Sequence, residues 1–401
     1  MEQVRSLKTG LKYKDTPIGR IPVDWEIASL GKIAKFEYGA SLPEQKRTNG
    51  NFPVYGSNGI VGYHGEALAN GPGIVIGRKG TVGAITWADD SFWPIDTTYY
   101  ITKKQSKVYL KWLFYLLSDL HLERLNITTG VPGLNREQTH LVTIAIPPFI
   151  EQERIAEILI TVDHAIEKTN QIIEKTKELK RGLMQHLLTR GIRHTKFKKS
   201  EIGEIPEDWK LVHLGDIAKI ERGRFSHRPR NAPQFYGGDI PFVQTADIVN
   251  SNGRLRNYSQ TLNDLGLSIS KVFPKGTILI TIAANIGHTG ILEFDSACPD
   301  SLIGISPYES ISATYLHYYL SGQQKSMEVI APQCAQKNIN IQILKSWRVL
   351  LPSIEEQERI ANTLLTVDDE IEKESSRKEE LETLKKGLMQ VLLTGKLRVA
   401  V

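Results

Sequence analysis

Two distant segments of the chain share one pattern of apolar positions. The apolar side chains are spaced by four, three and four residues in both segments: Ile155, Leu159, Val162 and Ile166 in the first, and Ile360, Leu364, Val367 and Ile371 in the second. This period is typical of an α-helix with a narrow apolar stripe that packs against a partner helix. We expect each segment to form one helix of about 39 residues, roughly 58 Å long.

The two segments also repeat each other letter by letter. Glu151-Gln-Glu-Arg-Ile-Ala156 returns as Glu356-Gln-Glu-Arg-Ile-Ala361, an offset of 356 − 151 = 205 residues, and Gly182-Leu183 returns at the same offset as Gly387-Leu388. A glycine inside a helix costs about 1 kcal/mol relative to alanine. Because both copies carry it, we expect the backbone of the partner helix to approach closely at Gly182 and Gly387.

The charges in these segments favour an antiparallel pair. Acidic side chains gather where each segment begins and basic ones where it ends, so each acidic end would meet the basic end of its partner. Ser353 followed by Glu356 predicts a capping box at the second helix start. The predicted helix-pairing residues are Ile155, Leu159, Val162, Ile166, Gly182, Leu183, Ile360, Leu364, Val367, Ile371, Gly387 and Leu388.

A second repeat precedes each helix. Ile18-Gly-Arg-Ile-Pro-Val-Asp-Trp25 matches Ile202-Gly-Glu-Ile-Pro-Glu-Asp-Trp209 at an offset of 184 residues, so the second copy holds 205 − 184 = 21 extra residues before its helix. We therefore expect four parts: a first domain over 1–147 with its leading motif at 18–39, a helix over 148–193, a second domain over 194–351 with its leading motif at 202–223, and a helix with a tail over 352–401.

The two ends of the chain together resemble the linker between the halves. Tyr13-Lys14 matches Phe197-Lys198, and Thr394 to Arg398 matches Thr189 to Arg193 at the offset of 205 residues. A chain with this property is expected to be a cyclic, pseudo-twofold molecule with its termini side by side.

Each domain alternates short apolar runs with glycine, which predicts strands joined by turns. Gly73–Gly77, followed by Arg78-Lys79-Gly80 and Val82–Ile85, predicts a hairpin with two cations at its tip, and residues 109–122 predict a helix packed on that sheet. In the second domain, residues 239–243 and 276–281 are strand-like, 284–287 a turn and 313–320 a helix. The expected fold class is α/β, with two related domains joined by two long antiparallel helices.

Composition restricts the class of protein. The chain has 401 residues, 40% of them hydrophobic and 24% charged, which is ordinary for a globular protein. Its two cysteines, Cys298 and Cys334, form neither a disulfide framework nor a zinc cluster, and no apolar run reaches membrane-spanning length. We expect a cytoplasmic protein that does not enter a membrane. The net charge of +5 permits a polyanionic partner without requiring one.

The order of these repeats resembles a known family. Two variable domains, each introduced by Ile-Pro-x-Asp-Trp…Leu-Gly and followed by Gln-Glu-Arg-Ile-Ala…Gly-Leu-Met-Gln, are similar to the DNA-specificity subunit of type I restriction–modification systems. The resemblance implies that each domain reads one half of a bipartite, asymmetric site in double-stranded DNA. It also implies that the helices set the spacer and dock two methyltransferase subunits, with which restriction (translocase) subunits associate. The subunit itself would have no catalytic centre.

The search for catalytic residues agrees with this resemblance. Ile146-Pro-Pro-Phe149 has an isoleucine where an amino-methyltransferase motif requires Asn or Asp, and Asp163-His164 with Glu167 loses its histidine in the second copy, where Asp369 stands. No glycine-rich loop of a nucleotide- or cofactor-binding type occurs. We therefore expect no catalytic residue, no metal and no cofactor.

Loop residues that could hydrogen-bond phosphates or base edges are the candidate DNA contacts. They are Arg47, Ser57, Asn58, Arg78, Lys79 and Thr128 in the first domain, and Arg222, Arg224, Arg228, Gln244, Thr245, Asn285, His288, Lys337 and Asn338 in the second. Two other functions remain open. One is a specificity protein for a methylase or a fused restriction–modification enzyme outside type I. The other is a coiled-coil scaffold that binds only proteins.

Overall fold

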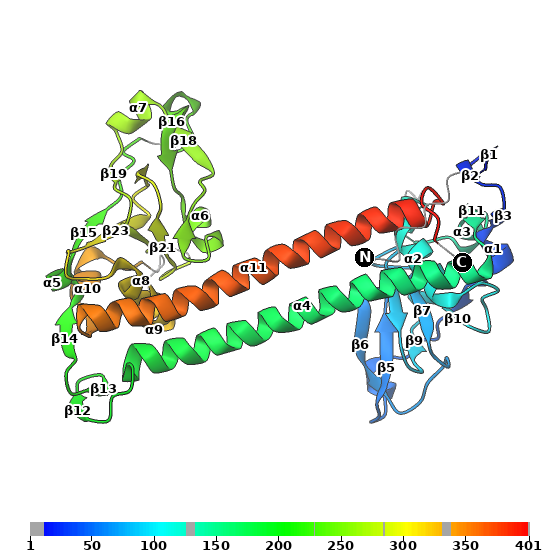
Figure 1. Ribbon diagram of the computed structural model, residues 1–401, viewed down its shortest axis with the longest axis horizontal. Coiled ribbons are helices and arrows are strands. Elements are labelled where there is room, and N and C mark those ends of the chain that lie inside the picture. The colour runs from blue at the N-terminus through cyan, green and yellow to red at the C-terminus, as the bar shows by residue number, and fades with distance from the viewer. Residues whose placement is uncertain (1–11, 126–132, 228, 284, 331–337, 400–401) are drawn as a thin grey trace. The chain divides into compact units, whose positions relative to one another are not determined.

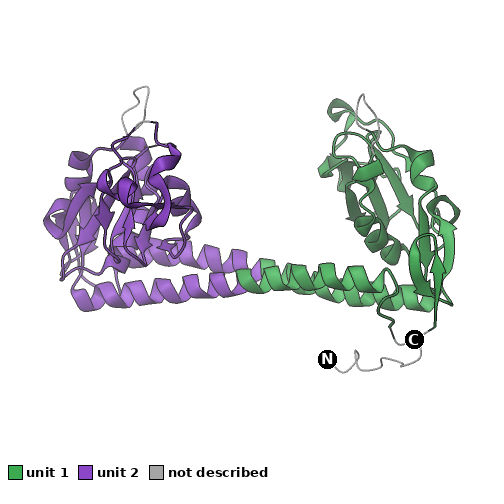
Figure 2. Ribbon diagram, turned by 90° about the horizontal axis from the view of Figure 1, so that it is seen from above, with its two compact units in different colours: residues 1–170, 375–401 green, residues 171–374 purple. Residues whose placement is uncertain are grey.

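The computed structural model describes residues 12–125, 133–227, 229–283, 285–330 and 338–399. The chain divides into two compact units (Figure 2): residues 1–170 with 375–401 form unit 1, and residues 171–374 form unit 2. The two long helices are α4 (Phe149–Arg190) and α11 (Ile354–Leu392), of 42 and 39 residues. Figure 1 labels both helices, and their predicted lengths are confirmed. Each helix contributes one part to each unit.

Unit 1 contains a four-stranded sheet, a three-stranded sheet and two strand pairs. The larger sheet has the order β4-β10-β7-β8 and the smaller one β6-β5-β9. Its strands are β1 (Tyr13–Thr16), β2 (Gly19–Pro22), β3 (Glu26–Ser29), β4 (Glu37–Tyr38), β5 (Phe52–Gly56), β6 (Gly59–His64), β7 (Gly73–Gly77), β8 (Ile85–Ala88), β9 (Trp93–Pro94), β10 (Thr98–Thr102) and β11 (Thr143–Ile146). Its shorter helices are α1 (Leu30–Ile33), α2 (Leu110–Asp119) and α3 (Arg136–His140), with 3₁₀ turns at Glu44–Lys46 and Leu122–Leu125.

Unit 2 repeats this plan with larger sheets, β15-β23-β20-β21-β17 and β18-β16-β22-β19. Its strands are β12 (Phe197–Ser200), β13 (Gly203–Pro206), β14 (Lys210–His213), β15 (Ala218–Arg222), β16 (Tyr236–Phe242), β17 (Arg254–Leu255), β18 (Gln260–Leu262), β19 (Val272–Phe273), β20 (Ile278–Thr281), β21 (Thr289–Leu292), β22 (Ser296–Ala297), β23 (Leu302–Pro307) and β24 (Arg348–Leu351). Its shorter helices are α5 (Leu214–Ile217), α6 (Thr245–Asn250), α7 (Asp264–Ser268), α8 (Ala313–Gly322), α9 (Gln324–Ile330) and α10 (Ile341–Lys345), with a 3₁₀ turn at Pro233–Phe235.

The predicted hairpin in unit 1 is present, but its tip differs from the expectation. β7 pairs antiparallel with β8 up to the pair Ile76–Ile85, so residues 78–84 form the connecting loop. Arg78 and Lys79 therefore begin a loop instead of occupying a tight turn. The Lys79 backbone makes an isolated bridge to Gly133, and this second attachment holds the loop beside the segment that precedes α3.

The apolar stripe of each long helix packs mainly into its domain. In unit 1, Ile155 and Leu159 are fully buried in the core that contains Leu392 and Leu393 from the end of α11. In unit 2, Ile360 and Leu364 lie in the core that contains Leu187 and Leu188 from the end of α4. Each helix start is thus fixed to the domain of its unit by burial of apolar surface. Val162 is also buried, whereas Ile166, Val367 and Ile371 are half-buried.

The expectation for the two mid-helix glycines is wrong. Gly182 and Gly387 are exposed, and a Cβ placed on either would meet no atom within 4 Å. Neither position therefore needs glycine for close approach of the partner helix. The next residues in the chain, Leu183 and Leu388, are half-buried and pack on the cores of unit 2 and unit 1. The glycines lie on the outward face because the leucines occupy the inward one.

Both units show the predicted antiparallel helix pairing, and in the same register. In unit 1 the Lys385 ammonium lies 2.7 Å from Asp163. In unit 2 the Lys180 ammonium lies 2.6 Å from Asp368. The residue numbers sum to the same value in both pairs, 163 + 385 = 548 and 180 + 368 = 548. One side-chain pairing rule therefore holds for both ends of the helix pair.

Candidate nucleic-acid interface

Two separate candidate segments of unit 1 meet at one backbone carbonyl. The Arg78 and Lys79 backbone amides donate to the Thr97 oxygen at 2.9 and 3.1 Å. The Ser57 hydroxyl donates to the same oxygen at 3.0 Å. Ser57 and Asn58 form the turn of the β5–β6 hairpin, between the paired residues Gly56 and Gly59. Strand pairing thus brings this hairpin turn next to the cationic loop.

The Arg78 side chain is held in a defined position. Its Nε and Nη2 atoms donate to the Asp96 carbonyl at 3.2 and 2.9 Å, and its guanidinium lies 5.4 Å from the centre of the Tyr38 ring. The Arg136 guanidinium lies 4.9 Å from the same ring. Arginine over an aromatic face is stabilised electrostatically and keeps other N–H groups available to a ligand. Lys79 is exposed beside this pair.

Arg136 is a cationic neighbour that was not among the sequence candidates. It lies in the first turn of α3, whose preceding residue Asn135 caps the helix by accepting from the Gln138 amide at 3.1 Å. The pattern Asn-Arg-Glu-Gln predicts a helix start, but it does not show which loop that start will face. The bridge between Lys79 and Gly133 and the bond from the Leu134 amide to the Arg78 carbonyl at 2.8 Å bring the segment to the site.

Unit 2 builds an equivalent site with its arginine at the end of a strand, β15, instead of in a loop. The Ile282 amide donates to the Ser301 oxygen at 3.3 Å. This bond is the counterpart of the one from the Arg78 amide to the Thr97 oxygen in unit 1. The Arg222 Nε donates to the carbonyl of Asp300 at 2.6 Å, as Arg78 does to that of Asp96. Arg222 lies 184 residues after Tyr38, which is the offset between the two leading motifs. By sequence, Arg222 is therefore the counterpart of Tyr38 and not of Arg78. Both units therefore place a guanidinium on the same carbonyl by different routes.

Beside this arginine is a hollow with an aromatic base and a polar rim. Phe225, Tyr236 and Phe242 line it together with Arg230, Gln244 and Thr245. Arg230 forms an ion pair with the Asp300 carboxylate, and the Gln244 side-chain amide donates to Gln260. Gln244 and Thr245, predicted from sequence, are thus brought close to the Arg222 site.

The remaining candidates of unit 2 are divided between this region and others. Asn285 and His288 occupy the turn between β20 and β21, where the His288 amide donates to the Thr281 hydroxyl at 3.0 Å. The Asn338 backbone forms an isolated β-bridge with Ala283, as the Gly133 backbone does with Lys79 in unit 1. Arg224 is directed elsewhere, because its guanidinium donates to the Ser270 carbonyl at 2.6 and 3.2 Å. Thr128, Arg228 and Lys337 lie outside the described residues.

Each unit also contains a three-residue cluster that ties its domain to both long helices, which we call the clasp. In unit 1 the Tyr115 hydroxyl of α2 donates to Asp163 at 2.6 Å, and Asp163 pairs with Lys385. In unit 2 the Tyr318 hydroxyl of α8 donates to Asp368 at 2.6 Å, and Asp368 pairs with Lys180. Burial, followed by the bond to aspartate, raises the pKa of both phenols, so they remain donors. The clasp therefore gives the Asp163 carboxylate a structural role, as acceptor for Tyr115 and ion-pair partner of Lys385.

The repeated tryptophans bind the starts of the long helices. The Trp25 indole donates to Glu151 at 2.9 Å, and the Arg398 Nε donates to Glu151 at 2.6 Å. In unit 2 the Trp209 indole donates to Glu356 at 2.9 Å, where His194 Nε2 lies 2.9 Å from the same carboxylate. The counterpart of Arg398 is thus His194, at an offset of 204 residues, and not Arg193.

The same contacts correct the predicted capping box. The Glu356 amide donates to the Ser353 hydroxyl at 3.3 Å, as a cap requires. The Glu356 carboxylate binds Trp209 and accepts from the Ile192 amide at 2.9 Å, so the reciprocal half of the box is replaced by contacts to the domain.

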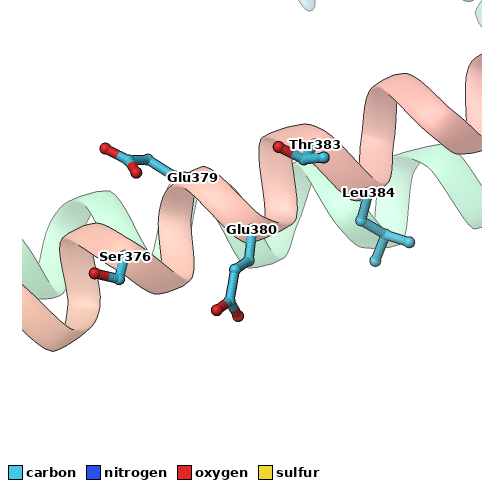
Figure 3. A pocket seen from close by; sticks show the side chains of 5 residues that line it. All are labelled: Ser376, Glu379, Glu380, Thr383 and Leu384. Atoms are coloured by element: carbon cyan, nitrogen blue, oxygen red, sulfur yellow. The ribbon is translucent and has the colours of Figure 1, made fainter.

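A shallow hollow along α11 is unsuited to DNA. Figure 3 shows that its lining, Ser376, Glu379, Glu380, Thr383 and Leu384, comes from one helix. Its two carboxylates would repel phosphates. Within the described ranges, no helix has the length and apolar character needed to cross a membrane.

Comparisons with known proteins agree with this organisation. A family model described as "Type I restriction modification DNA specificity domain" matches residues 22–178 and 206–383. The MjaX protein of Methanocaldococcus jannaschii, whose name describes it as a type I restriction enzyme specificity subunit, is 30% identical to this chain. The match covers 96% of this chain and 97% of that protein. The MjaVIII specificity subunit of the same organism is 28% identical, over 95% and 94%.

A solved structure shares the fold. The S subunit of a type I restriction–modification system from M. genitalium has a TM-score of 0.65 at 14% identity, covering 96% of this chain and 97% of that one. The two matches of the family model correspond to the two halves of the repeat. The chain belongs to the family of type I restriction–modification DNA specificity proteins.

Proposed function

We propose that this chain is the DNA-specificity subunit of a type I restriction–modification complex, with each domain reading one half of a bipartite, asymmetric site. The observation that carries the proposal is the pair of equivalent arginine sites, Arg78 on the Asp96 carbonyl and Arg222 on that of Asp300. Exposed cations, amides and hydroxyls near a fixed guanidinium are the groups that contact phosphates and base edges. The surrounding loops differ between the domains, which supports two different half-sites.

The long helices take the second role in this proposal. They set the spacer between the half-sites and dock two methyltransferase subunits, with which restriction subunits associate. The identical pairing register in the two units supports a helix pair built as one ruler. The chain would act in the cytoplasm as a non-catalytic member of the complex. The same proposal includes the division of the chain into four parts. The recognition domains span 1–147 and 194–351, and the helical parts span 148–193 and 352–401.

Methylation mapping tests this function. The chain is expressed with its methyltransferase in cells that lack other adenine methylation, and modified adenines are mapped across the genome. We expect one bipartite motif with a fixed spacer and two different halves. Purification of the complex from its own cells separates the two restriction–modification interpretations: an associated ATP-dependent translocating subunit supports type I, and a complex that lacks such a partner would indicate a system outside type I. A chain that binds proteins and confers no sequence preference on DNA would be the scaffold.

A further inference from the structure

The β5–β6 hairpin of unit 1 presents apolar side chains to solvent on an edge strand. Ile60 is 51% exposed, Val61 48% and Tyr63 56%. β6 is the outer strand of the sheet β6-β5-β9. Large apolar side chains gathered on one strand of a folded domain indicate a binding surface. We call this hairpin, residues 52–64, the ribbon.

Charge shows what kind of surface binds the ribbon. No residue from Gly56 to Tyr63 is charged. The ribbon is flanked by cations on both sides: Arg47 donates from Nη1 to the Val61 carbonyl at 2.8 Å, and Arg78 and Lys79 share the Thr97 carbonyl with Ser57 of the turn. A neutral, apolar strip between cations matches a polyanion that offers apolar groups between two rows of phosphates. The major groove of DNA is such a surface, because thymine methyl groups lie on its floor.

The shape of the ribbon agrees with this assignment. The major groove, about 12 Å wide, admits a two-stranded β-ribbon. The two strands are joined at Ser57-Asn58, so the turn places an amide side chain at the leading end. The bond from Arg47 to the Val61 carbonyl occupies a backbone acceptor that an added peptide strand would need. This bond favours recognition through side chains over strand addition by a protein.

The second domain lacks this feature. β16 pairs in parallel with β22 as β5 does with β9, which makes β18 the counterpart of β6. β18 carries Gln260 and Thr261, with Leu262 fully buried. The exposed apolar strip is therefore specific to the first domain, as expected for a feature that distinguishes two half-sites.

We propose that the ribbon enters the major groove of the first half-site and that Ile60 and Val61 contact thymine methyl groups there. This inference rests on the proposed function and adds a base preference to it: the first half-site contains at least one A·T pair recognised by its methyl group.

Uracil substitution tests the contact on the unaltered protein. The complex of this chain with its methyltransferase is titrated with duplexes of the mapped site in which single thymines are replaced by uracil, which lacks only the methyl group. Loss of one buried methyl contact corresponds to an affinity about fourfold lower. We expect this decrease at one or more thymines of the half-site whose recognition depends on Arg78 and Lys79, which the Arg78→Ala, Lys79→Ala variant identifies.

A double-mutant cycle then assigns the contact to the ribbon. In the Ile60→Ala, Val61→Ala variant the thymine duplex should bind about as weakly as the uracil duplex, and uracil should cause no further decrease, because both changes remove the same contact. Leu265→Ala is the matched control: Leu265 is a 52% exposed leucine on α7 of unit 2. This control should keep the full uracil effect.

Two results would overturn the inference. These are equal affinity of the unaltered complex for thymine and uracil duplexes, and an undiminished uracil effect in the ribbon variant. Reduced binding of methyltransferase by that variant, without any uracil effect, would assign the ribbon to the protein partner. If the complex shows no sequence preference on DNA, the proposed function itself is refuted. If it shows a bipartite preference but binds thymine and uracil duplexes equally, only the proposal for the ribbon is refuted.

Discussion

At the scale of single residues, the proposed recognition sites depend on a few side chains held by backbone carbonyls. Arg78 and Arg222 are fixed on equivalent carbonyls, while Lys79 is exposed beside the first. Because a fixed guanidinium loses little freedom when it binds, it is suited to reading one base edge or positioning one phosphate.

We predict that the Arg78→Ala, Lys79→Ala variant relaxes or abolishes recognition of one half-site and that Arg222→Ala affects the other. The loss of a good base contact costs about 1–3 kcal/mol. Methylation mapping of both variants gives the result. Lys103→Ala, another exposed lysine of unit 1, is the control. Unchanged affinity and an unchanged motif in the double variant would contradict the assignment of Arg78 and Lys79.

A second residue-scale prediction concerns pH. Burial, with added repulsion from Lys180 and Arg254, lowers the pKa of His317 to about 3, and its Nδ1 lies 3.0 Å from the Thr289 hydroxyl. The unfolded chain, with a histidine pKa near 6.5, therefore binds more protons than the folded one between about pH 6.5 and 3. Stability of α8 should be complete above about pH 6.5 and should fall as the pH drops, by up to about 1.4 kcal/mol per unit.

Hydrogen exchange of the full chain at pH 7.5 and 5.5, corrected for intrinsic rates, measures this effect. Protection of α8 should decrease at the lower pH, and protection of α2 should not, because Phe114 precedes Tyr115 where His317 precedes Tyr318. The His317→Phe variant should lose the difference. Equal losses of protection in α2 and α8 would show that His317 is not the cause.

At the scale of elements, the clasps connect each domain to both long helices. Each clasp uses one helix of the domain, one residue of α4 and one of α11, in the same geometry twice. A tyrosine bond to a charged partner contributes roughly 1.5–3 kcal/mol. Such a bond can fix the angle of a domain around the helix pair.

We predict that Tyr115→Phe, or Tyr318→Phe, loosens the spacer without changing the bases read. Methylation of a site library with spacers one base pair shorter or longer should increase, because the domain can rotate on the helices. Tyr319→Phe is the matched control, since the Tyr319 hydroxyl donates to the Arg348 carbonyl at 3.2 Å inside its own domain. Altered bases at an unaltered spacer would rule out this positioning role.

The length of the helices gives a second element-scale test. Four residues inserted into α4 between Asp163 and Lys180, and four into α11 between Asp368 and Lys385, leave both clasps intact and add about 6 Å. We expect a longer spacer and the same bases. Insertion into α11 alone breaks the shared register and should destabilise the protein. Changed bases at a fixed spacer would refute the ruler.

At the scale of the whole molecule, the repeat suggests that one half can replace the other. A fragment that ends near Arg193 would expose the apolar residues of its helix, which a second copy could cover. The structure changes the useful end point. The counterpart of Arg398 at Glu151 is His194, so a fragment that extends to Lys199 retains the residue needed to complete that contact in a dimer.

We predict that the fragment 1–199 forms a twofold dimer and, with its methyltransferase, modifies a palindrome built from the first half-site. In the dimer Lys180 of each copy would take the place of Lys385 opposite Asp163. Sedimentation measures the association and methylation mapping the motif. A stable monomer, or a dimer that modifies the asymmetric site, would mean that the halves are not interchangeable.

The sequence by itself determined the two long helices, their antiparallel pairing and the duplicated order of motifs. These features follow from local periodicity and from repetition, which can be read without knowing which strands pair. The DNA-contact residues remain predictions, although the structure brings several of them together at Thr97 and around Arg222.

Only the tertiary structure decided which side chains share a site. Arg78 and Lys79 reach the Thr97 carbonyl because β10 pairs with β7, and Ser57 reaches it because β5 pairs with β9. Arg222 reaches the carbonyl of Asp300 because β15 pairs with β23. The outward position of Gly182, the inward role of Glu356 and the exchange of Arg398 for His194 were likewise invisible in the sequence. Each depends on contacts between residues far apart in the chain, whose geometry is set by packing and not by local propensity.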